Sequence, residues 1–253
     1  MIQMNKVLTL RKYVAASVHD LENLSNKQIV CVSPKKFNDP IDTYFYFSDD
    51  DCFKKSKKIL TQEIMDTIRI SCFINQKGIY EKRKGNKLTS NEILMWTHYA
   101  DAHKGICLEY QVPIGDFGFI EGKPFDKSKI ILQKINYIEN LATDFEALFS
   151  DSEDEKYTET NFEYLLGTCF FTKDKSFEYE NEIRLLEFVG SSSEIELTHV
   201  PMPFDYLTEI VFGERCPLDL KYLINCINKQ VYSGKITLKQ INNHFQEENY
   251  YDK

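Results

Sequence analysis

The sequence predicts a single α+β domain over residues 1–253. Segments with the apolar alternation of strands outnumber segments with helical spacing. No internal repeat is visible, and no Gly-, Ser- or Pro-rich linker separates two halves. The composition, with 42% hydrophobic and 13% aromatic residues, is sufficient for a large buried core.

Apolar spacing and capping residues predict the elements in order. Ser17 with Asp20, and Thr89 with Glu92, have the spacing of N-terminal capping boxes, so a helix is expected after each pair. Gly105 is placed to end the second of these helices. The expected strands are 7–13, 28–32, 68–73, 106–112, 129–138, 182–188, 195–200, 207–212 and, closing the chain, 236–241. The other expected helices are 54–68, 158–171 and 218–229.

Two loops are notable between these elements. Residues 33–40 contain two prolines and the pair Asn38-Asp39, which is typical of a shaped loop, and loops of this kind often carry function. An acidic loop at about 149–157 is expected to be solvated, because like charges favour exposure.

Charge and composition argue against several classes of function. Lys and Arg total 31 against 39 Asp and Glu, a net charge of -8, so we expect neither duplex nucleic acid nor a membrane as a partner. The N-terminus lacks the apolar region of a signal peptide, and no run approaches ~20 apolar residues, so we expect a soluble, cytoplasmic protein. The seven cysteines form no C-x-x-C pair, which argues against a disulfide framework and a zinc ribbon. No P-loop, G-x-G-x-x-G or H-E-x-x-H motif occurs, and no metal is expected.

Residues 95–105 are the densest group of aromatic and titratable side chains. His98 and His103 are five positions apart, about 140° around a helix, so this pair alone does not predict a zinc site. Trp96, Tyr99 and His103 would share one helical face. That face either stacks on a flat ring, such as a base or nicotinamide, or packs on the sheet. For His98 and Tyr99 the two alternatives are equally open.

Residues 177–186 contain a second group. In strand geometry Glu180, Glu182 and Arg184 point to one face, with the two carboxylates ~7 Å apart. Such a pair is able to divide chemical labour, because mutual repulsion raises one pKa while the guanidinium keeps the other carboxylate ionised. The alternative is an exposed edge strand with an ordinary surface ion pair.

Two further hypotheses rest on fewer features of the sequence. Cys72 is a candidate nucleophile with His98 or His103, but no recognisable nucleophile motif surrounds it. A nuclease that uses Asp39, Asp42 and Glu109 would require a metal, and acidic residues near proline more often belong to turns.

Several segments, read in order, resemble the signature of one large bacterial family, the domain of unknown function 2971. The segments are Lys12-Tyr13, residues 33–40 with Phe37-Asn38-Asp39-Pro40, Ser71-Cys72-Phe73, residues 95–105, Tyr179-Glu180-x-Glu182-x-Arg184-Leu185, and residues 210–213. The resemblance extends over nearly the whole chain.

The order of elements in that family resembles the ADP-ribosyltransferase superfamily. The resemblance implies a split, mostly antiparallel sheet flanked by helices, with NAD as substrate. By position it places Lys12 and Tyr13 at the first-strand site, Ser71 at the second-strand site, and Glu180-x-Glu182 at the late-strand site.

The same resemblance implies roles for these residues. Glu182 would stabilise the positive charge that develops when the nicotinamide–ribose bond breaks, and Glu180 would orient the acceptor. The acceptor would be a protein, a nucleic acid or a small molecule. Lys12 or Lys35 would meet the pyrophosphate. The expected contacts to the nucleotide are Lys12, Tyr13, Ser33, Asn38, Asp39, Trp96, His98, Tyr99 and Arg184.

Two positions depart from the family pattern. Val14 stands where relatives often have Arg, and Ile74 stands where many have Ser. Either departure implies an altered substrate or a site that binds without turnover. The leading hypothesis is therefore an enzyme in a toxin or phage-defence setting, and the alternative is a non-catalytic nucleotide- or peptide-binding module of a bacterial defence system.

Overall fold

The structure is a computed structural model that describes residues 7–37, 42, 65–75, 85–113, 130–139, 170–190, 196–202 and 206–251. It is an α+β chain with many strands, mostly paired antiparallel, and few helices. The chain forms two compact units, which we call unit 1 (Met1–Val30, Cys72–Asp116 and His199–Lys253) and unit 2 (Cys31–Ser71 and Phe117–Thr198). The expectation of a single domain stays a prediction.

The sheet of unit 1 is centred on two long strands. β1 (Val7–Val14) pairs antiparallel with β4 (Ile106–Pro113), which pairs antiparallel with β10 (Leu207–Phe212). β10 pairs in parallel with β11 (Thr237–Ile241), and β11 pairs antiparallel with β12 (Glu247–Asn249). On its other side β1 pairs with β3 (Ile68–Asn75) through Asn75 and Ile74.

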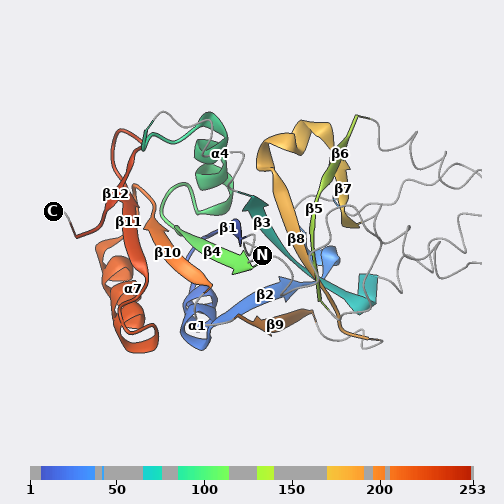
Figure 1. Ribbon diagram of the computed structural model, residues 1–253, viewed down its shortest axis with the longest axis horizontal. Helices are drawn as coiled ribbons and strands as arrows, with labels where there is room; N and C mark the ends of the chain where they lie inside the picture. The colour runs from blue at the N-terminus through green and yellow to red at the C-terminus, as the bar shows by residue number, and fades with distance from the viewer. Residues whose placement is uncertain are drawn as a thin grey trace, which may run out of the picture. The chain divides into compact units, whose positions relative to one another are not determined.

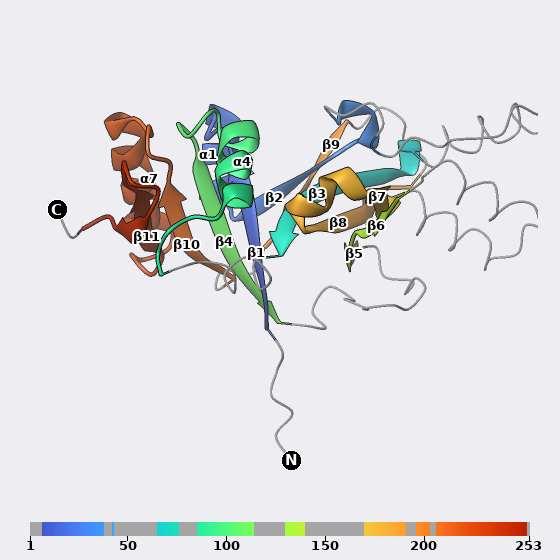
Figure 2. The same ribbon diagram turned by 90° about the horizontal axis from the view of Figure 1, so that it is seen from above.

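Three helices cover this sheet. α1 (Val18–Asn26) and α4 (Ser90–Tyr99) lie on opposite sides of β1 and β4, and α7 (Leu218–Val231) lies beside β10 and β11 (Figures 1 and 2). Both expected capping boxes are confirmed, Ser17 with Asp20 at α1 and Thr89 with Glu92 at α4. α7 joins two parallel strands, a connection that needs a crossover element of this kind.

Alternation along β1 separates its side chains between the two faces. Tyr13 contacts Trp96 of α4, and Arg11 shares that face because it is two residues away. Lys12 and Val14 point to the opposite face, where they line a pocket together with Leu24 of α1.

Unit 2 contains the residues around β8 (Glu182–Phe188). β8 pairs antiparallel with β5 (Ile130–Lys134) and also pairs with β3, and β3 pairs with β2 (Gln28–Val32) at Val32↔Ile70. β9 (Leu197–Pro201) follows β2 in the strand order. Separately, β6 (Asn136–Ile138) pairs in parallel with β7 (Thr172–Asp174), and the short 3-10 helices are η1 (Pro34–Lys36) and η2 (Lys175–Glu180).

The structure differs from the sequence prediction at four elements. The helix expected to run to Gly105 ends at Tyr99, because Asp101, Ala102 and His103 all adopt positive φ angles that a right-handed helix does not accept. The strand expected at 129–138 is divided into β5 and β6. Residues 175–180 form η2 rather than extended chain. The strand at 236–241 is not the last, since β12 follows it.

Several expected elements lie wholly or mostly outside the described residues: helices 54–68 and 158–171, the acidic loop at 149–157, and much of the loop 33–40, including Asn38 and Asp39. Within the described ranges, no helix has the length and apolar character needed to cross a membrane.

Candidate functional site

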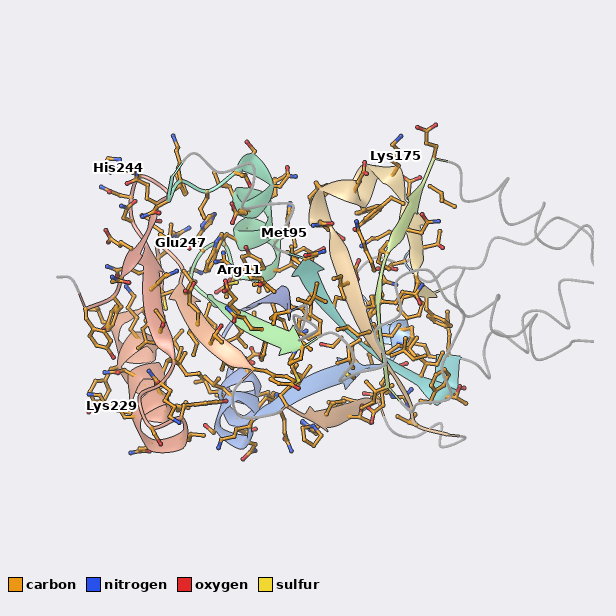
Figure 3. The ribbon with its side chains drawn as sticks, in the orientation of Figure 1. Arg11, Met95, Lys175, Lys229, His244 and Glu247 are labelled. Carbon is orange, nitrogen blue, oxygen red and sulfur yellow. The ribbon has the colours of Figure 1, made fainter. Side chains whose placement is uncertain are left out.

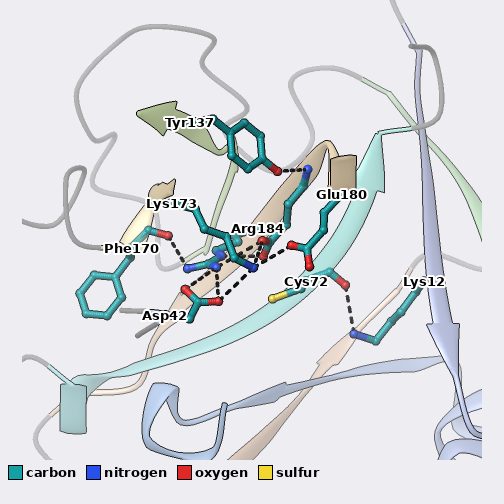
Figure 4. Close-up of polar contacts among 9 residues, drawn as sticks. Lys12, Asp42, Cys72, Tyr137, Phe170, Lys173, Glu180 and Arg184 are labelled. Atoms are coloured by element: carbon teal, nitrogen blue, oxygen red, sulfur yellow. Dashed lines mark hydrogen bonds and ion pairs between the residues drawn. The ribbon is translucent and has the colours of Figure 1, made fainter. Parts of the chain in front are cut away.

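Five charged side chains of unit 2 form a buried group that we call the Lys173 cluster: Asp42, Lys173, Glu180, Glu182 and Arg184 (Figure 4). The ammonium group of Lys173 is at its centre. Nζ lies 2.7 Å from Glu180 Oε2, 3.4 Å from Glu182 Oε2 and 3.4 Å from Asp42 Oδ2. One cation thus contacts three carboxylates.

Arg184 is the second cation of the Lys173 cluster and is completely buried. Its Nε donates to Glu182 Oε1 at 2.6 Å, and Nη2 donates to both Asp42 oxygens at 2.7 Å. Nη1 donates to the carbonyl oxygen of Phe170 at 3.0 Å. Charge-assisted bonds of this kind are the strong ones in a protein interior, so the positions of Glu182 and Asp42 are tightly fixed.

The backbone between the two glutamates explains why they converge. Glu180 ends η2, and Asn181 adopts a left-handed conformation with φ 45° before Glu182 begins β8. The backbone N–H of Glu182 donates to the hydroxyl of Tyr137 at 2.8 Å. Tyr137 is the register partner of Lys173 across β6 and β7, so one pair of strands supports both the turn and the cation.

The burial of Glu180 and Glu182 excludes one of the two interpretations of residues 177–186. Glu180 is 3% exposed and Glu182 is 4% exposed, so they do not belong to a solvent-exposed surface ion pair. The strand geometry was also wrong for Glu180, which lies in η2. The turn at Asn181, rather than strand alternation, brings both carboxylates to one ammonium group.

Electrostatics in the Lys173 cluster favour the charged form of Lys173. Burial lowers the pKa of Lys173, but Glu182, Asp42 and Glu180 together raise it above its ordinary value. The ammonium therefore remains charged at neutral pH. Burial raises the pKa of Tyr137, which keeps its hydroxyl neutral. Three carboxylates against two cations leave the cluster with a formal charge of -1.

Unit 1 contains a second buried ionic group, the Arg11 cluster, formed by Arg11, Glu92, Glu109, Glu209, Glu247 and Lys239. Figure 3 labels Arg11 and Glu247. Arg11 Nε donates to Glu109 Oε2 at 3.0 Å, and Nη1 donates to Glu247 Oε1 at 2.7 Å. Burial, followed by the neighbouring Glu109, raises the pKa of Glu209. This cluster joins α4 to five strands of the sheet and is placed to stabilise unit 1.

Trp96 belongs to the interior of unit 1. It is 0% exposed, its ring meets Tyr13 edge to face at 5.2 Å, and it stacks on His103 at 6.2 Å. Trp96 Nε1 and His103 Nδ1 are both buried and have no hydrogen-bond partner among the described residues. Packing on the sheet is therefore what the structure shows for Trp96.

His98 and Tyr99 lie on the outside of α4 instead. Both side chains are exposed, Tyr99 by 41%, and their rings contact each other at 6.4 Å. The helical face expected from Trp96, Tyr99 and His103 is not formed, because His103 follows the end of the helix.

The turn after α4 is packed tightly against neighbouring backbone. A Cβ atom at Gly105 would lie 2.1 Å from the Val14 carbonyl oxygen, and one at Gly213 would lie 2.1 Å from the His103 carbonyl oxygen. Only glycine permits these approaches. The end of the 95–105 motif is thereby fixed against β1 and the loop after β10.

The other predicted contacts are distributed between the units. In unit 1, Lys12 donates to the Cys72 carbonyl oxygen at 3.3 Å and points away from Tyr13 (Figure 4). In unit 2, Ser71 is buried, and Ser33 caps η1 by accepting from the Lys35 N–H.

The residues of the rival hypotheses have other partners. Asp42 is bound by Arg184 in unit 2, whereas Glu109 is bound by Arg11 in unit 1. Cys72 is half-buried and forms no disulfide with the described cysteines. Among the described residues, no three His, Cys, Asp or Glu side chains are arranged to hold a metal ion.

Sequence reasoning missed Lys173 and Tyr137. Lys173 lies in a three-residue strand with no alternation that would mark it, and Tyr137 lies in a strand of the same length. The one available signal was the isolated Lys173 close to Phe170 and Phe171, since a lysine beside aromatic residues is sometimes buried with a carboxylate partner.

Neither the curated proteins nor the solved structures contain a match to the chain. The family described as "Protein of unknown function (DUF2971)" matches residues 95–185. The matched segment includes the 95–105 motif and four of the five residues of the Lys173 cluster, and the match supports the resemblance to that family.

Proposed function

We propose that the Lys173 cluster is the chemical centre of an NAD-dependent ADP-ribosyltransferase-like enzyme. The observation that carries the proposal is the convergence of Glu180 and Glu182 on Lys173, inside a buried group with one excess negative charge. In a site of low dielectric constant, fixed carboxylates stabilise a developing positive charge more strongly than water does.

In the proposed reaction, the negative charge of the Lys173 cluster would stabilise a positive charge on the substrate. The bond between nicotinamide and the ribose carbon breaks, neutral nicotinamide leaves with the bonding electron pair, and positive charge develops on the ribose. Glu182, the glutamate held by Arg184, stabilises this charge. Glu180 orients the acceptor and takes its proton as the new bond to ribose forms. The acceptor is a protein, a nucleic acid or a small molecule.

The further nucleotide contacts stay predictions from the sequence. In unit 2 they include Ser33, Ser71 and Lys35, and Lys35 pairs with Asp66. In unit 1 they include Lys12, Tyr13, His98 and Tyr99, whereas Trp96 is packed in the interior. The toxin or phage-defence setting likewise stays a prediction.

The second candidate function is a non-catalytic nucleotide- or peptide-binding module. The pairing of both glutamates with buried cations favours it, because carboxylates held in this way are stable without turning over a substrate. This candidate requires ligand binding that does not depend on chemistry at Glu182.

Nicotinamide release from NAD by the purified chain tests the proposal. We expect release by the unaltered protein and a loss of about 100-fold or more in Glu182→Gln, as when an electrostatic stabiliser is removed from an active site. Glu178→Gln is the matched control, because Glu178 is exposed on the same 3-10 helix and should retain activity. Thermal melting of each variant checks that it is folded.

Three results are distinguishable. Release that depends on Glu182 supports the enzyme. Stabilisation by NAD without release, equal in Glu182→Gln and Glu178→Gln, supports the binding module and overturns the enzyme. If the protein neither releases nicotinamide nor is stabilised by NAD, both proposals are overturned as far as they concern NAD.

A further inference from the structure

Unit 1 contains a pocket between α1 and the sheet, on the face of β1 opposite to Trp96. Its volume is about 40 Å³, which is enough for about three water molecules or a small organic group. All of its lining residues belong to unit 1. None of the glutamates of the Lys173 cluster lines it, and Lys12 is the lining residue that is also a predicted nucleotide contact. An inference about this pocket therefore does not depend on the chemistry proposed for the Lys173 cluster.

The pocket contains a polar group without a protein partner. Tyr110 on β4 is 4% exposed and lines the pocket. Its ring contacts Phe73, but among the described residues its hydroxyl makes no hydrogen bond. Burial, followed by the nearby Tyr232, raises the pKa of Tyr110, so the hydroxyl remains a neutral donor. Because Tyr110 lines the pocket and its hydroxyl makes no bond to the described residues, a group inside the pocket is able to accept its hydrogen bond.

The hydroxyl of the neighbouring Tyr232 already makes a hydrogen bond within the protein. Tyr232 lines the same pocket and donates to the Leu24 carbonyl oxygen at 2.7 Å. Its hydrogen is therefore committed to the protein. Tyr110 is the phenol that is able to donate to a ligand.

The charged side chains of the pocket favour an anion. Lys12 and Lys27 both line it, and the Lys27 ammonium lies 5.7 Å from the centre of the Tyr232 ring. Asp20 is the one acidic side chain in the lining, and its carboxylate accepts from the Ser17 N–H at 2.8 Å and the Ser17 hydroxyl at 2.7 Å. Two cations and one capped carboxylate give the pocket a formal charge of +1 in a chain whose net charge is -8.

The walls of the pocket are apolar. They are formed by Leu24, Ile29, Leu108, Met202 and Leu207, all buried. An inorganic anion would leave these side chains in contact with water, whereas an organic acid would cover them with its hydrocarbon part. The pocket therefore combines one phenol donor and two ammonium groups with a hydrocarbon-lined interior.

We propose that this pocket is a binding site for a small carboxylic acid in its anionic form, with the carboxylate accepting from the Tyr110 hydroxyl and its short apolar chain against Leu108 and Leu207. The positive charge of Lys12 and Lys27 attracts the carboxylate. The size of the pocket limits the ligand to a few carbon atoms.

Three probes with the same hydrocarbon chain test the proposal: butanoate, the neutral butanamide and the cationic butylammonium. NMR titration of the full chain should show saturable binding of butanoate in the millimolar range, at least about tenfold weaker binding of butanamide, and none of butylammonium. The shifted resonances should include Leu24, Leu108 and Tyr110.

Two variants locate the binding. Tyr110→Phe removes only the hydroxyl, whereas Lys12→Met removes the charge together with the bond to the Cys72 carbonyl oxygen. Each variant should weaken butanoate binding by at least about tenfold. Tyr99→Phe and Lys104→Met are matched controls at exposed positions outside the pocket and should bind as the unaltered chain does. Tyr110→Phe retains the shape of the core, so it keeps the test valid if Lys12→Met fails to fold.

Other outcomes overturn the proposal. Absence of saturable binding of butanoate would show a pocket filled by water only. Equal binding of all three probes would show unspecific apolar contact. Unchanged butanoate binding in Tyr110→Phe would exclude the hydrogen bond on which the proposal depends.

Discussion

Lys173 Nζ lies 2.7 Å from Glu180 Oε2, and neither side chain is exposed by more than a tenth. The ammonium also contacts Glu182 and Asp42, so its removal would leave three buried carboxylates with Arg184 alone. The stability of unit 2 should therefore depend on this one cation.

Replacement of Lys173 tests that dependence. We expect Lys173→Met to lower the free energy of unfolding by about 3–5 kcal/mol, the usual cost of breaking a buried ion pair. Lys173→Arg should restore part of the loss because it keeps the charge. Urea denaturation measures both variants. Lys175→Met is the control, because Lys175 is exposed and its ion pair within the described ranges is with the exposed Glu139, and it should change little. A loss in Lys173→Met no larger than in the control would contradict the ionic role.

Glu209 in the Arg11 cluster should destabilise unit 1 at neutral pH. Burial and Glu109 raise its pKa, so the folded state favours the protonated acid more than the unfolded state does. The contribution of Glu209 to stability is present at pH values below the ordinary pKa of a glutamate. It is lost as the pH rises through the raised pKa. Glu209→Gln, a neutral isostere, should therefore raise the melting temperature by about 2–4 °C at about pH 7.5.

The increase in melting temperature caused by Glu209→Gln should be smaller at about pH 4.5, because Glu209 in the unaltered protein keeps its proton there. Glu214→Gln, at an exposed position after β10, is the control and should show no such pattern. Equal gains at both pH values would mean that packing, and not the charge of Glu209, causes the effect.

His103 should make the protein sensitive to acid. Burial lowers its pKa below the ordinary value of 6.5, so its contribution to stability is present above that value and is lost as the pH falls toward the lowered pKa. His103→Gln should remove part of the difference in stability between about pH 7.5 and about pH 5.5, as measured by urea denaturation. His98→Gln changes an exposed histidine of the same motif and should leave the difference intact. A result that is the same in both variants would exclude His103 as the source.

Trp96 is the chain's one tryptophan, so its fluorescence reports on one place. Because the ring is completely buried, we expect a blue-shifted emission maximum and little quenching by iodide in the native protein, with a red shift on unfolding. NAD that stacked directly on the ring would quench this emission. A red-shifted maximum or efficient iodide quenching in the native state would contradict the burial of Trp96.

Interactions between residues close in sequence were predictable. Ser17 with Asp20 and Thr89 with Glu92 lie within one helical turn, and both capping boxes form as expected. The strand at Gln28–Val32 follows from alternation, which is also a local property. The helix end near residue 105 was misplaced, because residues 101–103 adopt positive φ angles in a turn that packs against Gly213, far along the chain.

The sequence by itself determined the class of the fold, most of the strands, both helix caps and the grouping of Glu180, Glu182 and Arg184. Only the tertiary structure decided that this group is buried, that Lys173 is its centre, and that Tyr13 faces α4 while Lys12 faces the pocket beside α1. The physical reason is distance along the chain. A cap or an alternating pattern is fixed by the next few residues, whereas Arg11 meets Glu247 across 236 positions, and such a pair depends on strand order and register, which local patterns do not encode.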